Sequence, residues 1–331
     1  MDPVSQGVLG ASASLSVSRR EHLVLAVLCG WLAGMAPDLD SFIRSDTDPL
    51  LYLEYHRQFT HALVFIPVGA LICAVVFQFT IARRLEFKLT YIYCLVGYAT
   101  HGLLDSCTTY GTQLFWPFSN TRVAWHAVSI IDPIFTIPLL LFVSLGAILK
   151  SHRWGYIAVI WACLYLLLGL IQGKRAEHFA VQLAASREHN PVRLETKPSF
   201  ANILVWKTIY EFEGRYYVDA VRVGTQMQLY PGKSVRKLEL SRDLPWLDLN
   251  SQQAKDLERF RWFSNDYLAL SENKNNFIVD MRYSILPNQV TGLWGIQLQT
   301  YKTASEHVEF VWDRRITDTD KQMLLKMLTG K

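Results

Sequence analysis

The sequence predicts an α-helical membrane bundle of five to six transmembrane helices, followed by a smaller soluble α+β domain with an antiparallel sheet. Half of the 331 residues are hydrophobic, but the charges are unevenly spread. Residues 1–172 contain ten Lys/Arg and ten Asp/Glu, whereas residues 173–331 contain twenty-three and nineteen. Because only the first part combines long apolar runs with few charges, we divide the chain into a membrane domain (1–172), an exit helix and linker (173–200) and a soluble α+β domain (201–331).

The membrane domain is expected to contain six helices. Four apolar runs have roughly the length that crosses a hydrocarbon core of about 30 Å: residues 61–80, 87–105, 130–149 and 154–172. The runs 4–18 and 22–36 are shorter, and we interpret them as a helical hairpin that turns at 19–21. The first of these runs is rich in Gly, Ala and Ser, and such small residues allow helices to pack closely.

The remainder of the chain changes character after the last apolar run. Residues 174–188 predict a helix that leaves the membrane, and Pro191 and Pro198 indicate a linker. From Ala201, aromatic and β-branched residues alternate with polar ones, which predicts a hairpin turning near Glu213 and Gly214. Further strands are expected at 277–286, 293–302 and 307–315, with short helices at 251–265 and at the C-terminus.

Loop charges predict the orientation of the bundle. The loops at 19–21, 81–88 and 150–153 carry seven Lys/Arg, and short basic loops stay in the cytoplasm. The opposite face carries eight of the ten acids of the membrane domain: Asp2, Asp38, Asp40, Asp46, Asp48, Glu54, Asp105 and Asp132. Lys174 and Arg175 argue for the reverse orientation but are outnumbered. We therefore expect a multi-pass protein of the bacterial inner membrane, with the acidic face and the C-terminal domain in the periplasm.

Composition and motifs exclude several functional classes. The net charge of +4 is too small to indicate a nucleic-acid partner. The five cysteines form no C-x-x-C pair, which argues against a zinc ribbon or a disulfide framework. The sequence also contains no P-loop and no G-x-S-x-G motif.

Histidines and aspartates are concentrated in four short segments: P-D-L-D at 37–40, H-R-Q-F-T-H at 56–61, H-G-L-L-D at 101–105 and I-D-P at 131–133. His101 and Asp105 are four residues apart near the end of a predicted helix, so both side chains lie on one face. His56 and His61 are five apart, which suits a loop histidine followed by one in the first turn of the next helix. Polar side chains of this kind beside membrane helices indicate a functional site.

Aspartates can complete such a site. Asp38 and Asp40 follow a proline that ends the preceding helix, and they can point the same way from an extended turn. Asp132 opens the fifth predicted helix, where an acid also suits the helix dipole. Taken alone, each of these side chains is more simply an interfacial residue or a helix start, and Asp46 and Asp48 are interpreted as part of a solvated loop.

Histidine and carboxylate ligands without thiolates fit zinc, manganese or a related divalent ion. Such an ion lowers the pKa of a bound water and so supplies a hydroxide nucleophile. Bridging carboxylates such as Asp38, Asp40 or Asp105 could hold more than one ion. Arg57 is the candidate catalytic residue, because its guanidinium suits an anionic substrate oxygen; the alternative is an arginine that reaches the lipid–water boundary. Residues 108–118 either line the mouth of the pocket or lie among the lipid headgroups.

The motifs together resemble those of the YdjM/YbcI-like inner-membrane proteins, described as membrane-bound metal-dependent hydrolases. The resemblance covers about residues 1–172 and, more weakly, the strand pair after Ala201. It rests on M-D-P at 1–3, G-x-x-P-D-x-D at 34–40, H-R-x-x-T-H at 56–61, HGLLDSCTTYGTQLFWPFS at 101–119 and I-D-P at 131–133. The resemblance implies eight ligands: Asp2, Asp38, Asp40, His56, His61, His101, Asp105 and Asp132.

The family is grouped with zinc-dependent phospholipases C and single-strand nucleases, which cleave phosphoesters at clustered His/Asp zinc sites. One departure concerns the N-terminus, where the family pattern M-D-x-x-[ST]-H has a histidine and this chain has Gln6. Glutamine is a poor zinc ligand, so this departure weakens the case for Asp2.

Two functions are consistent with these observations. The first is a membrane-bound metal-dependent hydrolase, with zinc favoured, that acts on a phosphoester, such as a lipid, at the membrane face. The second is a non-catalytic inner-membrane scaffold or transport-related protein with a structural cation site. The expected partners are membrane lipids, a small-molecule or lipid substrate, and a protein that binds the C-terminal domain.

Overall fold

The computed structural model describes residues 1–330, and these fall into two compact units. The first unit contains residues 1–43, 55–171 and 200–203. The second contains residues 44–54, 172–199 and the chain from 204 onward. Two segments therefore differ from the expected division: residues 44–54, from the middle of the membrane domain, pack with the second unit, and residues 200–203 pack with the first.

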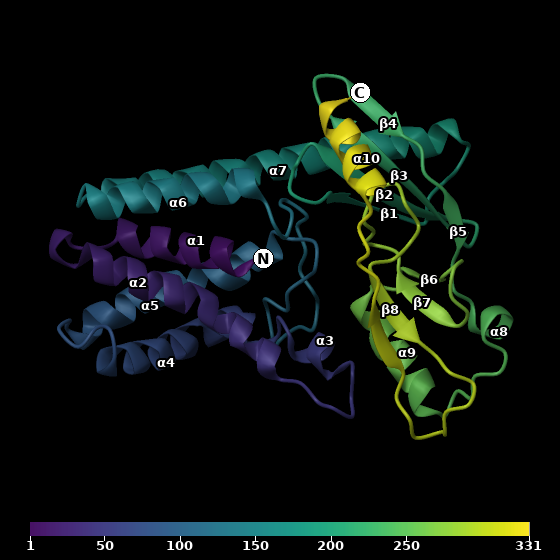
Figure 1. The fold of residues 1–331 in the computed structure, drawn as a ribbon, viewed down its shortest axis with the longest axis horizontal. Coiled ribbons are helices and arrows are strands. Elements are labelled where there is room, and N and C mark those ends of the chain that lie inside the picture. Colours follow the sequence, from purple (N-terminus) through teal and green to yellow (C-terminus); the bar gives the residue numbers. More distant parts are fainter. Residues whose placement is uncertain (331) are drawn as a thin grey trace. The chain divides into compact units, whose positions relative to one another are not determined.

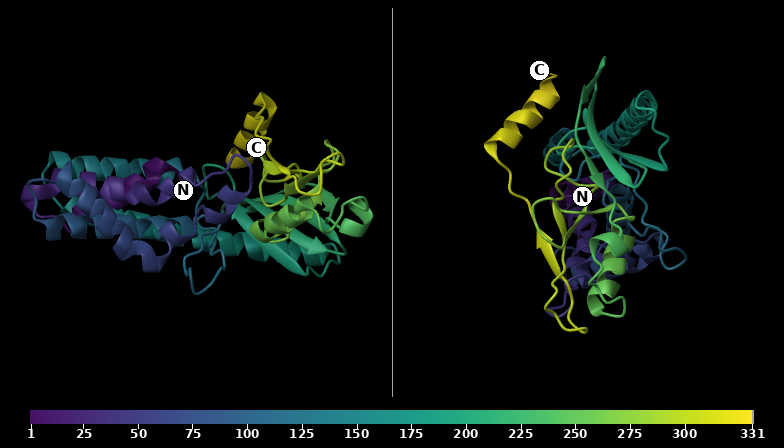
Figure 2. Two further views of the ribbon diagram at one scale, coloured as in Figure 1. Left: turned by 90° about the horizontal axis from the view of Figure 1, so that it is seen from below. Right: turned by 90° about the vertical axis from the view of Figure 1, so that its right-hand side faces the viewer.

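Helices make up most of the first unit, with a long non-helical stretch between Ser106 and Pro133 (Figures 1 and 2). They are α1 (Pro3–Ser16), α2 (Leu23–Met35), α4 (Ile66–Phe79), α5 (Phe87–Ser106), α6 (Pro133–Ile148) and α7 (Arg153–Ser186), which continues into the second unit. Short 3₁₀ helices lie between some of them: η1 (Arg20–His22), η2 (Ala36–Phe42), η3 (Phe59–His61) and η4 (Leu63–Phe65). The expected hairpin of two short helices at the N-terminus is present.

Small residues bring the helix backbones close together. Helix α1 packs against α2, α5 and α6, and α2 packs against α5. A Cβ atom on Gly30 would lie 2.5 Å from the carbonyl oxygen of Gly10, and one on Gly97 would lie 2.6 Å from the carbonyl oxygen of Gly30. Since real Cβ atoms need more room, glycine is required where these three helices meet. This confirms the close packing expected of the first apolar run.

Fewer membrane spans are supported than the five to six expected. Within the described residues, two helical segments are long and apolar enough to cross a membrane, Arg20–Phe42 and Arg153–Ser186. A third candidate is the pair Leu51–His61 and Leu63–Phe79, which is bent by 57°. Helix α6 is apolar but has only 16 residues, and α5 carries Thr, Tyr, His and Asp side chains. Length and composition thus identify two to three candidate spans.

The second unit contains two antiparallel sheets among the described residues, where we expected one. The first sheet contains β1 (Arg193–Pro198), β2 (Val205–Phe212), β3 (Arg215–Val223), β4 (Met227–Tyr230) and β5 (Ser234–Arg236). The second contains β6 (Leu268–Leu270), β7 (Phe277–Asp280), β8 (Trp294–Gln297) and β9 (Glu309–Trp312). The helices of this part are α3 (Leu51–Tyr55), α8 (Leu240–Asp243), α9 (Gln252–Phe263) and α10 (Asp318–Thr329).

The sequence-based expectations for this unit are partly confirmed. The hairpin turn is at Glu213 and Gly214, which both have positive φ, as the commonest two-residue hairpin turn requires. The exit helix is not separate, because good helix formers follow Gly173 and α7 continues without a break. The expected linker is also wrong in part, since residues 193–198 form the edge strand β1, paired with β2. An edge strand tolerates Pro198 at its end.

Candidate metal centre

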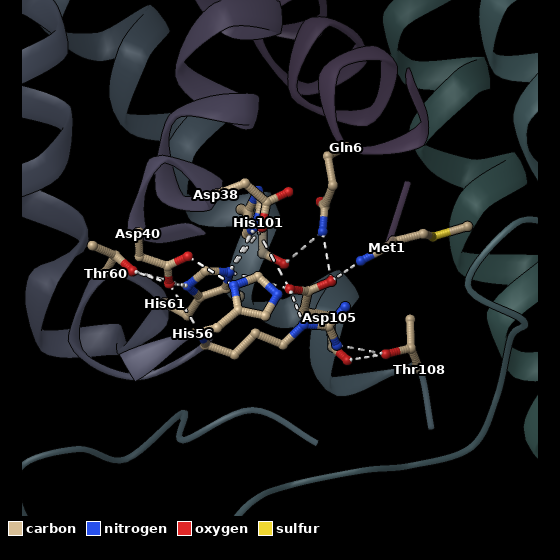
Figure 3. A network of polar contacts seen from close by, with 12 residues as sticks. Met1, Gln6, Asp38, Asp40, His56, Thr60, His61, His101, Asp105 and Thr108 are labelled. Carbon is tan, nitrogen blue, oxygen red and sulfur yellow. Dashed lines mark hydrogen bonds and ion pairs between the residues drawn. The ribbon is translucent and has the colours of Figure 1, made fainter. Parts of the chain in front are cut away.

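Three of the four motif segments meet in the first unit, where six of the eight predicted ligands come together (Figure 3). Helix α2 ends at Met35, and the chain continues as the 3₁₀ helix η2, in which a proline takes up one of the first two positions. The contributing elements are η2 with Asp38 and Asp40, the turn before η3 with His56, η3 with His61, and the last turns of α5 with His101 and Asp105. The two aspartates therefore project from a tight helical turn, which corrects the expected extended one, and His61 precedes α4.

Asp38, His61, His101 and Asp105 form the first group of potential ligands. Asp38 Oδ1 lies 3.5 Å from His61 Nε2 and 3.4 Å from His101 Nε2. Asp105 Oδ2 lies 3.2 Å and 3.6 Å from the same two nitrogens, which are 2.9 Å apart. Ligands placed tetrahedrally at 2.0–2.2 Å around one ion are separated by roughly 3.3 Å. The spacing of the four atoms therefore fits a four-coordinate divalent ion.

One oxygen of this group lacks a hydrogen bond in the described part of the chain. Asp105 Oδ1 accepts hydrogen bonds from Gln6 Nε2, at 2.8 Å, and from the α-ammonium group of Met1. Asp105 Oδ2 is buried and accepts none, although Arg57 Nε lies 3.1 Å away. A buried carboxylate oxygen that accepts no hydrogen bond is costly, and a bound cation would add to the compensation that Arg57 gives it.

Hydrogen bonds from the opposite ring nitrogens aim the two histidines at this group. His101 Nδ1 donates to the carbonyl oxygen of Gly34 at 2.6 Å, which leaves the lone pair of Nε2 facing the cluster. His61 Nδ1 lies 3.2 Å from Asp40 Oδ2 and 3.0 Å from Thr60 Oγ1. The pattern of carboxylate, histidine and ligand position is the one that orients metal-binding histidines in proteins.

The second group of potential ligands contains Asp38, Asp40 and His56, so Asp38 belongs to both groups. Asp40 Oδ1 accepts a hydrogen bond from His56 Nδ1 at 2.8 Å. Asp40 Oδ2 accepts hydrogen bonds from the Arg57 backbone N–H, at 3.0 Å, and from Thr60 Oγ1, at 2.9 Å. The side chain of Asp38 is 26% exposed, whereas His61 and Asp105 are fully enclosed, so the cluster reaches solvent on the Asp38 side.

Arg57 lies beside the cluster and is almost completely buried. A terminal nitrogen donates to Thr108 Oγ1 at 2.9 Å, and the guanidinium lies 4.8 Å from the centre of the Tyr110 ring. The backbone of Arg57 is in the left-handed region, with φ 64°, which is uncommon for a residue with a side chain. Of residues 108–118, Thr108 and Tyr110 contact this arginine, whereas Phe115 and Phe118 are exposed.

The sequence pattern of the YdjM inner membrane protein family matches residues 1–176, more than half of the chain. The chain belongs to this family. The resemblance noted from the motifs is thereby confirmed, and the family description agrees with an inner-membrane location. The uncharacterized protein YfhP of Bacillus subtilis (strain 168) is 28% identical over 165 residues, which are 48% of this chain and 48% of YfhP. The chain thus spans about half the length of this curated relative. No solved structure matches the chain.

Two predicted ligands of this YdjM family member, Asp2 and Asp132, lie outside both groups. Asp2 Oδ1 accepts two backbone N–H groups of the first turn of α1, each at 3.1 Å. Asp132 Oδ1 accepts two backbone N–H groups of the first turn of α6, at 3.1 and 3.3 Å. Its other oxygen accepts a hydrogen bond from the hydroxyl of Tyr165 at 2.9 Å. Both side chains therefore act as helix N-caps, a role that an aspartate fills as readily as that of a ligand.

Sequence reasoning missed the residues that support the ligands. Gln6 stands where the YdjM family pattern has a histidine, and its side chain does reach the centre, as a hydrogen-bond donor to Asp105. That departure from the pattern was the available signal. Thr60 and Thr108 carry no signal of their own, because a threonine in a loop has many local uses. Gly102 is also required, since a Cβ atom there would overlap the carbonyl oxygen of His61.

Proposed function

We propose that this YdjM family protein is a membrane-bound, metal-dependent hydrolase that cleaves a phosphoester at the membrane face. The observation that carries the proposal is the first ligand group, in which two histidines and two aspartates lie at the spacing of a four-coordinate ion and one ligand, Asp38, is partly exposed. Nitrogen and oxygen ligands in this arrangement favour zinc. The second group shares Asp38 and offers a position for a second ion.

The residues around the ligands suit hydrolysis of a phosphoester. A bound zinc ion would supply a water of lowered pKa as the nucleophile. Arg57 would bind an anionic phosphoryl oxygen, because its guanidinium is held in place by Thr108 and Tyr110 and lies against the cluster. Asp40 would fix the rings of His56 and His61. A lipid is a suitable substrate because the ligands are carried at the ends of apolar helices.

A specific observation favours the second candidate function, a scaffold or transport-related protein with a structural cation. Four protein ligands fill the coordination of a tetrahedral zinc ion, and structural zinc sites are usually closed in this way. Hydrolysis would then require Asp38, the exposed and shared ligand, to leave room for water. The two functions therefore predict the same metal content but different activity.

Metal analysis of the purified protein tests the proposal. We expect stoichiometric zinc in the wild type, anomalous scattering at the cluster, and loss of the metal in the His61→Ala/His101→Ala double variant. His178→Ala is the matched control, because His178 is an exposed residue of α7 that contacts only Gln182 among the hydrogen bonds found. A wild type without metal, or a double variant with unchanged metal, would contradict the assignment.

Activity separates the two functions. A panel of phosphomonoesters, phosphodiesters, phospholipids and carboxyl esters should contain a phosphoester that the wild type cleaves. Arg57→Ala should retain zinc and lower kcat on the order of a hundredfold, as loss of one charged group at a reacting oxygen does elsewhere. Zinc retained without cleavage of any member of the panel would favour the structural cation instead.

A further inference from the structure

The segment that joins two of the proposed ligands packs with the other unit of the protein. The first unit ends at Ile43 and resumes at Tyr55, and the intervening residues 44–54 belong to the second unit. In the sequence, Asp40 comes shortly before this segment and His56 shortly after it. The conformation of residues 44–54 therefore restricts where the chain places Asp40 and His56, because each lies within four residues of an end of the segment.

A single arginine of α9 holds this segment. Arg259 contacts Asp48 with both terminal nitrogens, at 2.8 and 2.9 Å, and Glu54 with Nε, at 2.5 Å. Its third partner is Asp256, at 3.0 Å on the same helix. We call Arg259, Asp48, Glu54 and Asp256 the Arg259 clamp. This arrangement overturns the interpretation of Asp48 as part of a solvated loop.

Other residues of the same unit hold Asp256, one member of the clamp, in place. Asp256 is fully buried and also accepts hydrogen bonds from His307 Nδ1, at 2.8 Å, and from the backbone N–H of Val308, at 3.1 Å. Isolated ion pairs on a protein surface contribute little, but a two-point arginine–carboxylate contact within a network is an exception. Burial opposes the ionisation of Asp48, yet the hydrogen bonds from Arg259 outweigh it and keep the pKa of Asp48 below its usual value.

The segment also carries buried apolar side chains. Leu50 and Leu53, which lie between the two clamped acids, are almost completely buried. Residues 46, 47 and 49 line a cavity of about 470 Å³ together with residues from 302 to 311 of the same unit. Glu54 is two residues before His56 and three before Arg57, so the clamped stretch ends next to these two residues of the site. Contacts at two points of a segment reduce the conformational freedom of the chain between them.

We infer that Arg259 is a positioning residue for the metal centre: by clamping Asp48 and Glu54, the C-terminal domain fixes the chain between Asp40 and His56. This inference rests on the proposed function, since it assumes that these residues belong to a metal centre. It gives the C-terminal domain a role in that centre although the domain supplies no ligand. Arg259 acts only through the segment it holds.

The test compares two arginines of the same helix in the full-length protein, purified in detergent. Arg259→Ala releases the segment, whereas Arg261→Ala removes contacts with Glu258 and Asp266 that lie wholly within the C-terminal domain. We expect zinc affinity, measured by competition with a chelator, to fall about tenfold in Arg259→Ala, as for loss of a group that orients a ligand, and to stay unchanged in Arg261→Ala.

Two further readouts report on the site itself. The absorption spectrum of bound cobalt should change in Arg259→Ala but not in Arg261→Ala, and hydrogen exchange of residues 44–57 should become faster only in the former. Arg259→Lys, which keeps the charge but loses the two-point contact, should give an intermediate affinity. Asp48→Asn weakens the clamp from the other side and provides the test if Arg259→Ala does not fold.

The outcomes separate the inference from the proposed function. A wild type that binds no zinc overturns the metal centre and the inference with it. A wild type that binds zinc, with Arg259→Ala and Asp48→Asn matching Arg261→Ala in affinity and cobalt spectrum, overturns the positioning role alone. Faster hydrogen exchange together with weaker zinc binding in the clamp variants supports it.

Discussion

At the scale of single residues, the candidate metal centre concentrates charge where burial makes charge expensive. Asp40, Arg57 and Asp105 are each less than 5% exposed. Unpaired buried charges destabilise a fold strongly, so each must have a compensating partner. Arg57, Gln6 and the Met1 ammonium group provide part of this compensation for Asp105, and a divalent ion would provide the remainder.

Gly102 offers a test that leaves every ligand in place. In Gly102→Ala, the new methyl group would push on the carbonyl oxygen of His61 and displace its ring. We expect zinc affinity to fall on the order of tenfold or more, as for other changes that disturb ligand orientation. Gly146→Ala, also in a helix of the first unit, is the control, because its methyl group would mainly meet the end of the Leu15 side chain. Equal zinc content and affinity in both variants would contradict this reasoning.

Lys207 of β2 predicts a pH dependence of stability. Burial lowers the pKa of Lys207 to about 7, although Asp280 opposes the shift. In the unfolded chain a lysine titrates near 10.4, so between pH 7 and about 10 the unfolded state binds one more proton than the folded state. Stability should therefore rise with pH through this interval. Thermal unfolding in detergent, followed by tryptophan fluorescence, should give a higher Tm at pH 9 than at pH 7, and Lys207→Met should reduce that difference. A Tm that falls equally in both proteins would count against it.

The site residues that the sequence could predict are those whose spacing itself is informative. His101 and Asp105 are four residues apart, so they share a face wherever α5 is helical. His61 could be placed at the start of a helix because an apolar run begins there. Asp132 could not be assigned, because the first turn of a helix attracts aspartate whether or not a metal is near. Asp48 was misread because its partner, Arg259, is 211 residues away in the sequence.

At the scale of secondary-structure elements, the long helices follow from hydrophobicity and from local start signals. Asp132 caps α6 and Ser251 caps α9, each through hydrogen bonds to backbone N–H groups of the first turn. The strands were harder to predict. Strands β4, β5 and β6 have only three or four residues, too few to show a period, and their existence depends on pairing with neighbours. The division into two sheets depends on the same pairing.

The role of Asp132 as a helix cap gives a prediction at this scale. Asp132→Asn should preserve the cap, since asparagine accepts the same backbone hydrogen bonds, whereas Asp132→Ala should destabilise α6 by about 0.5–2 kcal/mol. Neither substitution should change the zinc content. Thermal unfolding and metal analysis of the two variants provide the measurement. Loss of zinc in Asp132→Asn would instead identify Asp132 as a ligand.

At the scale of the whole molecule, the chain passes between its two units more than once. Residues 44–54 enter the second unit and return, and α7 later leads into it for good, apart from residues 200–203. Hydropathy distinguishes apolar from polar stretches, so it predicted a boundary near residue 172. It could not predict the excursion at 44–54, because nothing in those residues except their charges marks them as bound to a distant helix.

The orientation of the bundle remains a prediction from loop charge, and reporter fusions can test it. Alkaline phosphatase fused after Lys331 should be active, because it folds only outside the cytoplasm, and β-galactosidase at that position should not. A fusion after Arg84, in a loop expected to be cytoplasmic, should give the opposite pair of results. If phosphatase is active after Arg84 and inactive after Lys331, the metal centre faces the cytoplasm.

The glycine contacts of the first unit have a consequence for biosynthesis. Helix α1 emerges from the ribosome early, but its Gly and Ser residues give it few side chains with which to hold a place among lipids. Its neighbours α5 and α6 are synthesised later, and Ser14 can donate its hydroxyl to the carbonyl oxygen of Tyr93, at 2.7 Å, only after the 79 residues that separate them have been added. The contacts of α1 with α5 and α6 can therefore form only after these later helices have been made, whereas those with α2 can form first.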